Sequence, residues 1–239
     1  MQNFNRSSFA STTSSTVYDS SLRAYMAKVY NFMAIALLIS GLVAFLVASS
    51  PTLMQAIFGT PLAFVVMLAP LGFVIFFSVK LDKISAAKAK TYLYIYSALM
   101  GLSLSTILIA YTGASVARTF FVAASTFGAM SIYGYTTKKD LTGMGSFLMM
   151  GLIGIIIASL VNLFMHSSAL EFAISMIGVV IFIGLTAYDT QKIKQNYYLF
   201  GGSNNNEATS KLAVTGALNL YMDFINLFIM MLRFLGDRR

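Results

Sequence analysis

Two aspartates lie inside apolar stretches of this chain, where a charged side chain is costly. Asp189 lies at the end of the stretch 170–190, and Asp223 lies near the centre of 212–232. An ionised side chain in the bilayer centre costs roughly 2.5 to 3.5 kcal/mol on insertion scales, so it normally has a partner or a use. Two carboxyl groups in a partly dry interior can share one proton, and without it they offer hard oxygen ligands to a cation. We therefore expect Asp189 and Asp223 to form a pH-sensing gate.

Other polar residues accompany both aspartates at helical spacing. Thr186 precedes Asp189 by three residues, and Asn219, Asp223 and Asn226 stand at i, i+4 and i+7, so each group shares one face of a helix. We expect these faces to turn into the bundle and to support the carboxyl pair. The alternative is that Asp223 and its asparagines only hold helices together, while Asp189 lies near water at the membrane surface.

The depths of the two aspartates conflict if helices end where the apolar stretches end. Asp223 then lies about 17 Å deep, whereas Asp189 lies within one turn of the membrane surface. The two carboxyl groups meet only if the sixth helix continues to Tyr197 or Tyr198, which would place these tyrosines at the interface. We predict this extension.

Composition places the whole chain in a membrane. Of the 239 residues, 58% are hydrophobic and 10% are charged, against roughly 25% charged in soluble domains. The mean hydropathy is +0.78. There is no cysteine, which excludes disulfides and thiolate metal sites, and a single histidine, which argues against a histidine-rich metal centre. Because no Gly-rich phosphate loop is present, we expect no nucleotide-driven pump and no resident cofactor.

Apolar stretches long enough to cross a bilayer predict an all-α polytopic membrane protein with seven transmembrane helices. Small residues four apart within several of these stretches indicate close helix packing: Gly101 with Ser105, Ala124 with Gly128, and Gly154 with Ala158. The seven predicted spans are 29–49, 60–79, 91–111, 115–137, 143–165, 170–190 and 212–232.

Basic residues in the connections predict the orientation. If every stretch spans once, 12 of the 16 Lys and Arg residues share one face, and the connections 50–59, 112–114 and 166–169 contain none. The positive-inside rule then places the N-terminus in the cytoplasm and the chain in the inner (plasma) membrane. The net charge of +8 is therefore a topology signal, and we expect membrane lipid rather than nucleic acid as the partner.

The two ends of the chain need separate interpretation. Residues 1–28 are Ser/Thr-rich and short of apolar side chains, so we predict a disordered cytoplasmic tail before a transmembrane domain of residues 29–239. Its acid-poor character also resembles a mitochondrial presequence, which makes the mitochondrial inner membrane a minor alternative. At the other end, Arg233, Arg238 and Arg239 would lie outside, against the general bias. We favour a spanning seventh helix over a re-entrant one because its apolar stretch is long enough.

Four segments of the sequence resemble the Bax inhibitor-1 (transmembrane Bax-inhibitor-motif) family in its bacterial form. The paired Tyr-Asp and Leu-Tyr-x-Asp-Phe-Ile-Asn motifs are specific, and the resemblance covers essentially everything after the N-terminal tail. The segments are IFIGLTAYDTQKIK (181–194), ALNLYMDFINLF (217–228), YSALMGLSLS (96–105) and GYTTKKDL (134–141).

The resemblance implies a seven-helix fold whose C-terminal helix is surrounded by the other six. It also implies a non-enzymatic, pH-sensitive calcium leak gated by two aspartates, which correspond to Asp189 and Asp223 and would be the calcium ligands. In the family a basic residue at the cytoplasmic end of the second helix is thought to latch one aspartate. Here Lys80 or Lys83 replaces arginine, and lysine has no bidentate fork.

Two rival functions remain open from the sequence. One is a non-transporting regulator that binds a membrane protease or a secretion complex through its N-terminal tail. The other is an intramembrane aspartyl protease with an aspartate dyad. Tyr188-Asp189 matches one motif of that class, but Leu220-Tyr221-Met222 precedes Asp223 where the second motif requires Gly-x-Gly.

Overall fold

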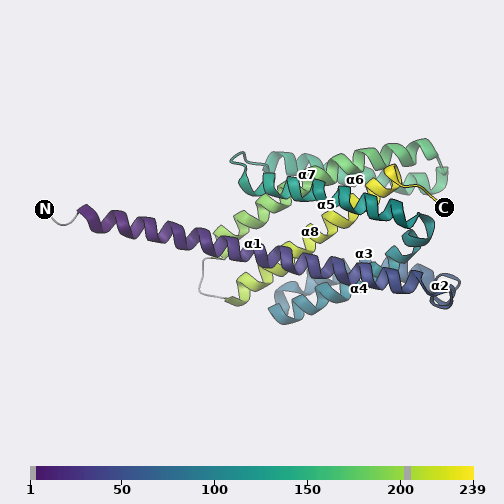
Figure 1. Ribbon diagram of the computed structural model, residues 1–239, viewed down its shortest axis with the longest axis horizontal. Coiled ribbons are helices and arrows are strands. Elements are labelled where there is room, and N and C mark those ends of the chain that lie inside the picture. The colour runs from purple at the N-terminus through teal and green to yellow at the C-terminus, as the bar shows by residue number, and fades with distance from the viewer. Residues whose placement is uncertain (1–3, 202–205) are drawn as a thin grey trace.

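The fold is known from a computed structural model, which describes residues 4–201 and 206–239, with side chains from residue 20 onward except that of Asp82. Helices make up nearly all of the described chain, and Figure 1 shows them lying along one long axis. They are α1 (Phe4–Ala48), α2 (Pro51–Phe58), α3 (Leu62–Lys80), the 3₁₀ turn η1 (Leu81–Lys83), α4 (Ala86–Ala110), α5 (Gly113–Thr136), α6 (Thr142–Met165), α7 (Ser168–Phe200) and α8 (Asn206–Leu235).

Short polar caps set where the helices begin. At α2, α4, α5 and α7, a hydroxyl at the N-cap accepts a hydrogen bond from a backbone amide three residues later, which satisfies one of the free N–H groups of the first turn. The connection 50–59, expected as a loop, contains the short helix α2 because Ser50 caps it and Pro51 occupies its first position. The other hydroxyl caps are Ser85 for α4, Thr112 for α5 and Ser167 for α7.

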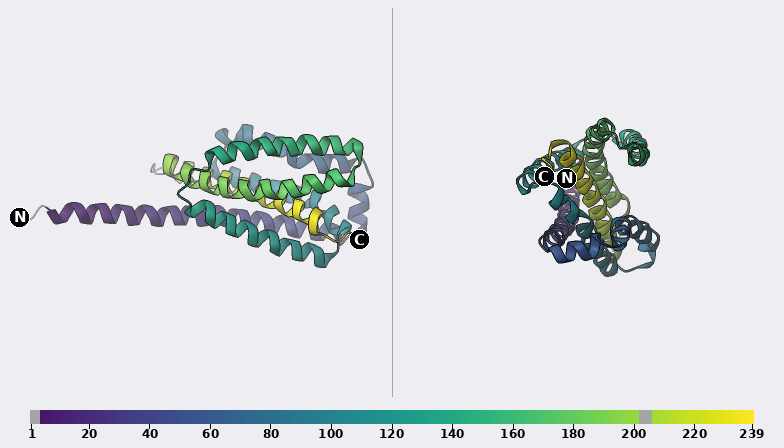
Figure 2. Two further views of the ribbon diagram at one scale, coloured as in Figure 1. Left: turned by 90° about the horizontal axis from the view of Figure 1, so that it is seen from above. Right: turned by 90° about the vertical axis from the view of Figure 1, so that its right-hand side faces the viewer.

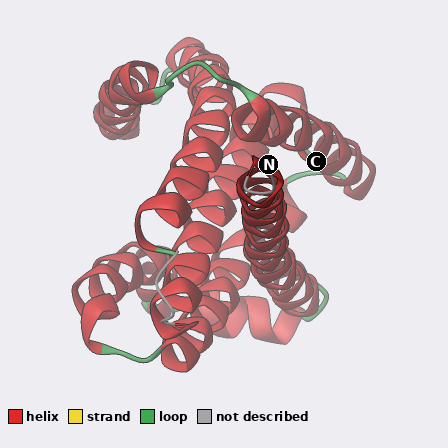
Figure 3. Ribbon diagram, turned by 90° about the vertical axis from the view of Figure 1, so that its left-hand side faces the viewer, coloured by secondary structure: helices red, strands yellow, loops and turns green. Residues whose placement is uncertain are grey.

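Seven of the described helices are long and apolar enough to cross a membrane: α1 from Ser20, and α3 to α8. Large apolar side chains point away from the bundle, among them Phe64 at 72%, Phe121 at 69% and Phe164 at 83% exposure. Such a surface is suited to lipid rather than water. The prediction of an all-α polytopic membrane protein is confirmed, and the end-on view in Figure 3 shows its helices joined by short loops.

The C-terminal helix α8 is the centre of the bundle. Two thirds of its apolar window (67%) is buried, compared with 39% for α7 and 11% for α6. The buried Tyr221 hydroxyl on α8 lies 2.6 Å from the Ser40 hydroxyl on α1, and Ser40 donates a 2.7 Å hydrogen bond to the carbonyl of Ser97 on α4. This contact joins three helices through one polar cluster.

The expectation that six helices surround α8 needs correction. Its principal neighbours are α7, α1, α5 and α4, whereas α3 packs mainly on α4 and α6 mainly on α7. Figures 1 and 2 show α8 crossing the bundle obliquely among these neighbours. The bundle therefore has an inner set of five helices, with α3 and α6 outside it.

The first transmembrane helix starts earlier than residue 29. Leu22, Tyr25 and Met26 are buried at 1%, 4% and 4% exposure, and the ring of Tyr25 stacks on that of Tyr197 at a centroid distance of 4.6 Å. Residues 20–28 thus belong to the packed bundle rather than to a tail. Residues 4–19 also lie in helix α1, where a disordered tail was expected for residues 1–28, and only residues 1–3 of that predicted tail lie outside the described structure.

The seventh long helix runs from one end of the bundle to the other. At its start, the carboxylate of Glu207 accepts a 2.6 Å hydrogen bond from the amide of Ala86, the first residue of α4. Beyond its end, the amide of Arg239 donates to the carbonyl of Ala110, the last residue of α4, at 3.0 Å. Contacts with both ends of α4 fit a spanning helix rather than a re-entrant one.

Candidate functional site

The carboxyl groups of Asp189 on α7 and Asp223 on α8 lie close enough for their charges to interact. Asp223 is buried at 6% exposure, and no N–H or O–H donor of the described residues reaches its Oδ2 atom. An ionised carboxylate only accepts hydrogen bonds, so a hydrogen bond between the two groups would require one proton. The structure thus brings together the two aspartates that the sequence singled out.

The predicted extension of the sixth spanning helix is confirmed and makes this contact possible. Helix α7 continues to Phe200, which places Asp189 about 17 Å from the helix end. Lys194, within the extension, donates a 2.9 Å hydrogen bond to the carbonyl of Tyr135 and lies over that residue's ring at 5.1 Å. The aliphatic part of the lysine can therefore lie against the bundle while its charge is satisfied.

Glycines on two neighbouring helices pack closely against α7 beside Asp189. A β-carbon on Gly134 of α5 would overlap the carbonyl oxygen of Ala187, and one on Gly145 of α6 would overlap the ring of Tyr188. Only a residue without a side chain allows the α5 backbone to approach that of α7, or the α6 backbone to approach the tyrosine ring, this closely. These glycines fix α7 between α5 and α6 at the level of the carboxyl pair.

The supporting polar residues do not converge on the pair. Thr186 is fully buried, but its hydroxyl donates to the carbonyl of Phe182 in its own helix at 2.7 Å. Asn219 and Asn226 are half-buried, and within the described structure neither hydrogen-bonds to Asp223. Asn226 instead lines a cavity between α6, α7 and α8.

The two lysines considered as a latch lie away from the aspartates. Lys80 ends α3, Lys83 ends the η1 turn, and both are exposed. Among the described residues no hydrogen bond or ion pair joins either of them to Asp189 or Asp223. The basic side chain whose charge acts on Asp189 is Lys192, one helical turn further along α7. Its spacing of i+3 from Asp189 was visible in the sequence.

Gln191 is a site residue that the sequence analysis missed. It is buried at 7% exposure. Its Nε2 donates to the carbonyl of Lys139 at 2.8 Å and its Oε1 accepts from the amide of Leu141 at 2.9 Å. It therefore holds the α5–α6 connection to α7 two residues after Asp189. In that connection, hydrogen bonds from the hydroxyl and amide of Thr142 hold the pKa of Asp140 below its ordinary value.

Replacing Gln191 by leucine is expected to loosen the α5–α6 connection. Leucine has a similar size but no hydrogen-bonding groups, so the partners on Lys139 and Leu141 lose their contacts at a cost of about 2 kcal/mol. Hydrogen exchange should speed up at residues 137–141. The matched variant Gln195→Leu, at an exposed position one turn later, should leave exchange unchanged. Equal protection in both variants would contradict the role assigned to Gln191.

Fold and site together define a polytopic membrane protein with seven long apolar helices and two neighbouring carboxyl groups on α7 and α8. The family model described as "Inhibitor of apoptosis-promoting Bax1" matches residues 22–239, so this chain belongs to the Bax inhibitor-1 family. It is 50% identical to protein RP147 of Rickettsia prowazekii over 95% of both chains. It is 48% identical to the inner membrane protein YbhL of Escherichia coli, over 91% of this chain and 93% of YbhL. A Borreliella burgdorferi protein is 49% identical over 90% and 92%.

Proposed function

We propose that this protein is a pH-sensitive cation leak with calcium as the transported ion and the Asp189–Asp223 pair as its gate. The observation that carries the proposal is the close approach of the two buried carboxyl groups across α7 and α8. With one proton, the pair forms a hydrogen bond that holds the helices together. Without it, two negative carboxylates repel each other and expose oxygen ligands to a cation. Flux should therefore rise as pH rises.

Aromatic packing next to the pair supports a closed state. The ring of Phe224, one residue after Asp223, packs edge-on against Phe120 and Phe127 of α5 at centroid distances of 5.6 and 5.5 Å. A cation that reached the carboxyl pair would meet this apolar layer next to it. Separation of α7 from α8 would loosen the layer, so one proton could control the whole path.

The ligand count favours passage over storage of calcium. Calcium takes six to eight oxygen ligands, whereas two carboxylates supply at most four. The described residues contain no group of three or more His, Cys, Asp or Glu side chains that could hold a metal ion. A calcium ion at the pair would keep several of its waters, and weak binding of this kind is what conduction requires.

We place the leak in the inner membrane with the N-terminus in the cytoplasm. The relative YbhL is named an inner membrane protein, and 12 of the 16 basic residues lie on the face that carries the N-terminus. In this orientation, the end of α7 that follows Asp189 faces the cytoplasm, and we expect the cytoplasmic pH to control the gate.

Purified protein in liposomes that contain a calcium dye tests the proposal. Calcium entry should be measurable, and it should increase as the pH is raised from about 6 to 8. One proton limits the increase to about tenfold per pH unit. Protein-free liposomes give the background. Flux equal to that background at every pH would overturn the leak, and would leave a non-transporting regulator as the function to pursue.

A further inference from the structure

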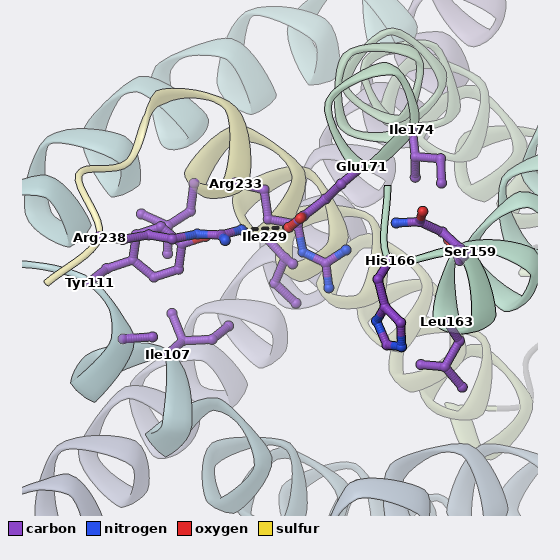
Figure 4. A pocket seen from close by; sticks show the side chains of 13 residues that line it. Ile107, Tyr111, Ser159, Leu163, His166, Glu171, Ile174, Ile229, Arg233 and Arg238 are labelled. Atoms are coloured by element: carbon purple, nitrogen blue, oxygen red, sulfur yellow. Dashed lines mark hydrogen bonds and ion pairs between the residues drawn. The ribbon is translucent and has the colours of Figure 1, made fainter. Parts of the chain in front are cut away.

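The end of the bundle that carries the C-terminus contains a charged cavity that the proposed leak does not use. The cavity has a volume of about 650 Å³ and lies among α4, α6, α7 and α8. Arg233, Arg238 and Glu171 contribute its charges, and His166 lines it from the α6–α7 connection (Figure 4). Apolar side chains of Ile174, Ile229 and Leu232 complete the lining.

The two arginines of the cavity differ in their partners. Arg238 forms an ion pair with Glu171 and donates from Nε to the Tyr111 hydroxyl at 3.3 Å. Arg233, in the last turn of α8, is exposed and has no hydrogen-bond or ion-pair partner among the described residues. The cavity therefore presents one unneutralised guanidinium, at the end of the bundle where the connections carry no Lys or Arg.

An apolar groove continues from this cavity along the outside of the bundle. It has a volume of about 420 Å³ and shares Ser159 and Leu163 with the cavity. Its α6 residues extend from Leu152 to Leu163, about 16 Å along the helix. This length is close to half of the hydrocarbon core, which is about 30 Å thick. Leu160 and Leu163 are exposed at 58% and 66%, so the groove opens toward lipid.

We propose that the cavity and the groove together bind one anionic phospholipid of the membrane leaflet at the C-terminal end of the bundle. Its phosphate lies against Arg233, because guanidinium groups favour phosphate oxygens. One acyl chain lies in the groove between α6, α7 and α8. A free anion would use the arginine but not the apolar groove, whereas a phospholipid uses both. This assignment gives a role to an arginine that the positive-inside rule disfavours at this position.

Native mass spectrometry of the purified full-length protein tests this site, with phosphatidylglycerol and phosphatidylcholine of identical acyl chains as probes. The wild type should prefer phosphatidylglycerol. Arg233→Ala should lower its affinity for this lipid about tenfold, since a charged hydrogen bond is lost, and should lower that for phosphatidylcholine less, because the choline cation already offsets the phosphate charge, so that the preference disappears. The control Arg239→Ala removes a neighbouring charge outside the cavity lining and should retain the preference. Unfolding temperatures equal to that of the wild type would confirm that both variants are folded.

Two further measurements separate a lipid from a soluble anion. Ser159→Phe places a large side chain where cavity and groove meet, so it should weaken binding of both lipids. Inorganic phosphate at millimolar concentration should not displace phosphatidylglycerol from the wild type. The proposal is overturned if phosphate displaces the lipid, if the wild type binds both lipids equally, or if Arg233→Ala and Arg239→Ala have the same effect.

Discussion

Gly134→Val is expected to destabilise the bundle by about 3 kcal/mol, the upper end of the usual cost of overpacking. Any β-carbon at this position of α5 would overlap the backbone carbonyl of Ala187 on α7. Backbone atoms cannot rotate away as a side chain can, so α5 and α7 must separate. The separation also disturbs the position of Asp189, two residues after Ala187. Unfolding of the purified protein with increasing SDS, followed by circular dichroism, measures the loss.

Gly128→Val is the matched control on the same helix. A β-carbon on Gly128 would meet nothing within 4 Å, and valine has a higher helix propensity than glycine by a few tenths of a kcal/mol. This variant should therefore be as stable as the wild type or slightly more stable. If both valine variants unfold at the same SDS concentration, the close contact between α5 and α7 does not limit stability.

Asp223→Asn is expected to remove the pH dependence of the calcium leak. Asparagine has nearly the same shape, and its amide can donate a hydrogen bond to Asp189 without sharing a titratable proton. The contact between α7 and α8 should then persist over the whole pH range. Flux should remain near the low level of the wild type at pH 6, and its increase of up to tenfold per pH unit should disappear. Dye-loaded liposomes measure both quantities.

Asp140→Asn provides the control for this loss of pH response. Hydrogen bonds from Thr142 lower the pKa of Asp140, so this exposed carboxylate is ionised throughout pH 6 to 8. Its replacement removes a negative charge from the α5–α6 connection without touching the carboxyl pair. The control should keep the full increase in flux. A response in Asp223→Asn as steep as that of Asp140→Asn would show that the gate lies elsewhere.

Hydrophobicity alone was enough to predict the spanning helices and to single out the two aspartates. A charge in an apolar stretch is rare and costly, so Asp189 and Asp223 stood out without any structure. The extension of α7 followed from requiring the two depths to match. The start of α1 was placed too late because Leu22, Tyr25 and Met26 lie in a segment that also contains two serines, an arginine and a lysine, and their burial depends on neighbours from distant parts of the chain.

Contacts made by small or neutral polar residues were not predictable in the same way. Of the small-residue pairs, Gly101 lies against the backbone of Ser40, but Gly128 and Gly154 have open space where a side chain would be. Spacing within one helix does not reveal which face meets another helix. Gln191 was missed for the same reason, since its partners on Lys139 and Leu141 are about 50 residues away.

We propose that loss of one proton from the Asp189–Asp223 pair opens the leak. Infrared spectroscopy and calcium flux, recorded on the same proteoliposomes as the pH is raised, test it most directly. We expect a protonated-carboxyl band that is absent from Asp223→Asn. This band should disappear with a midpoint at the same pH as the midpoint of the increase in flux. A band that persists unchanged while flux reaches its maximum would contradict the account.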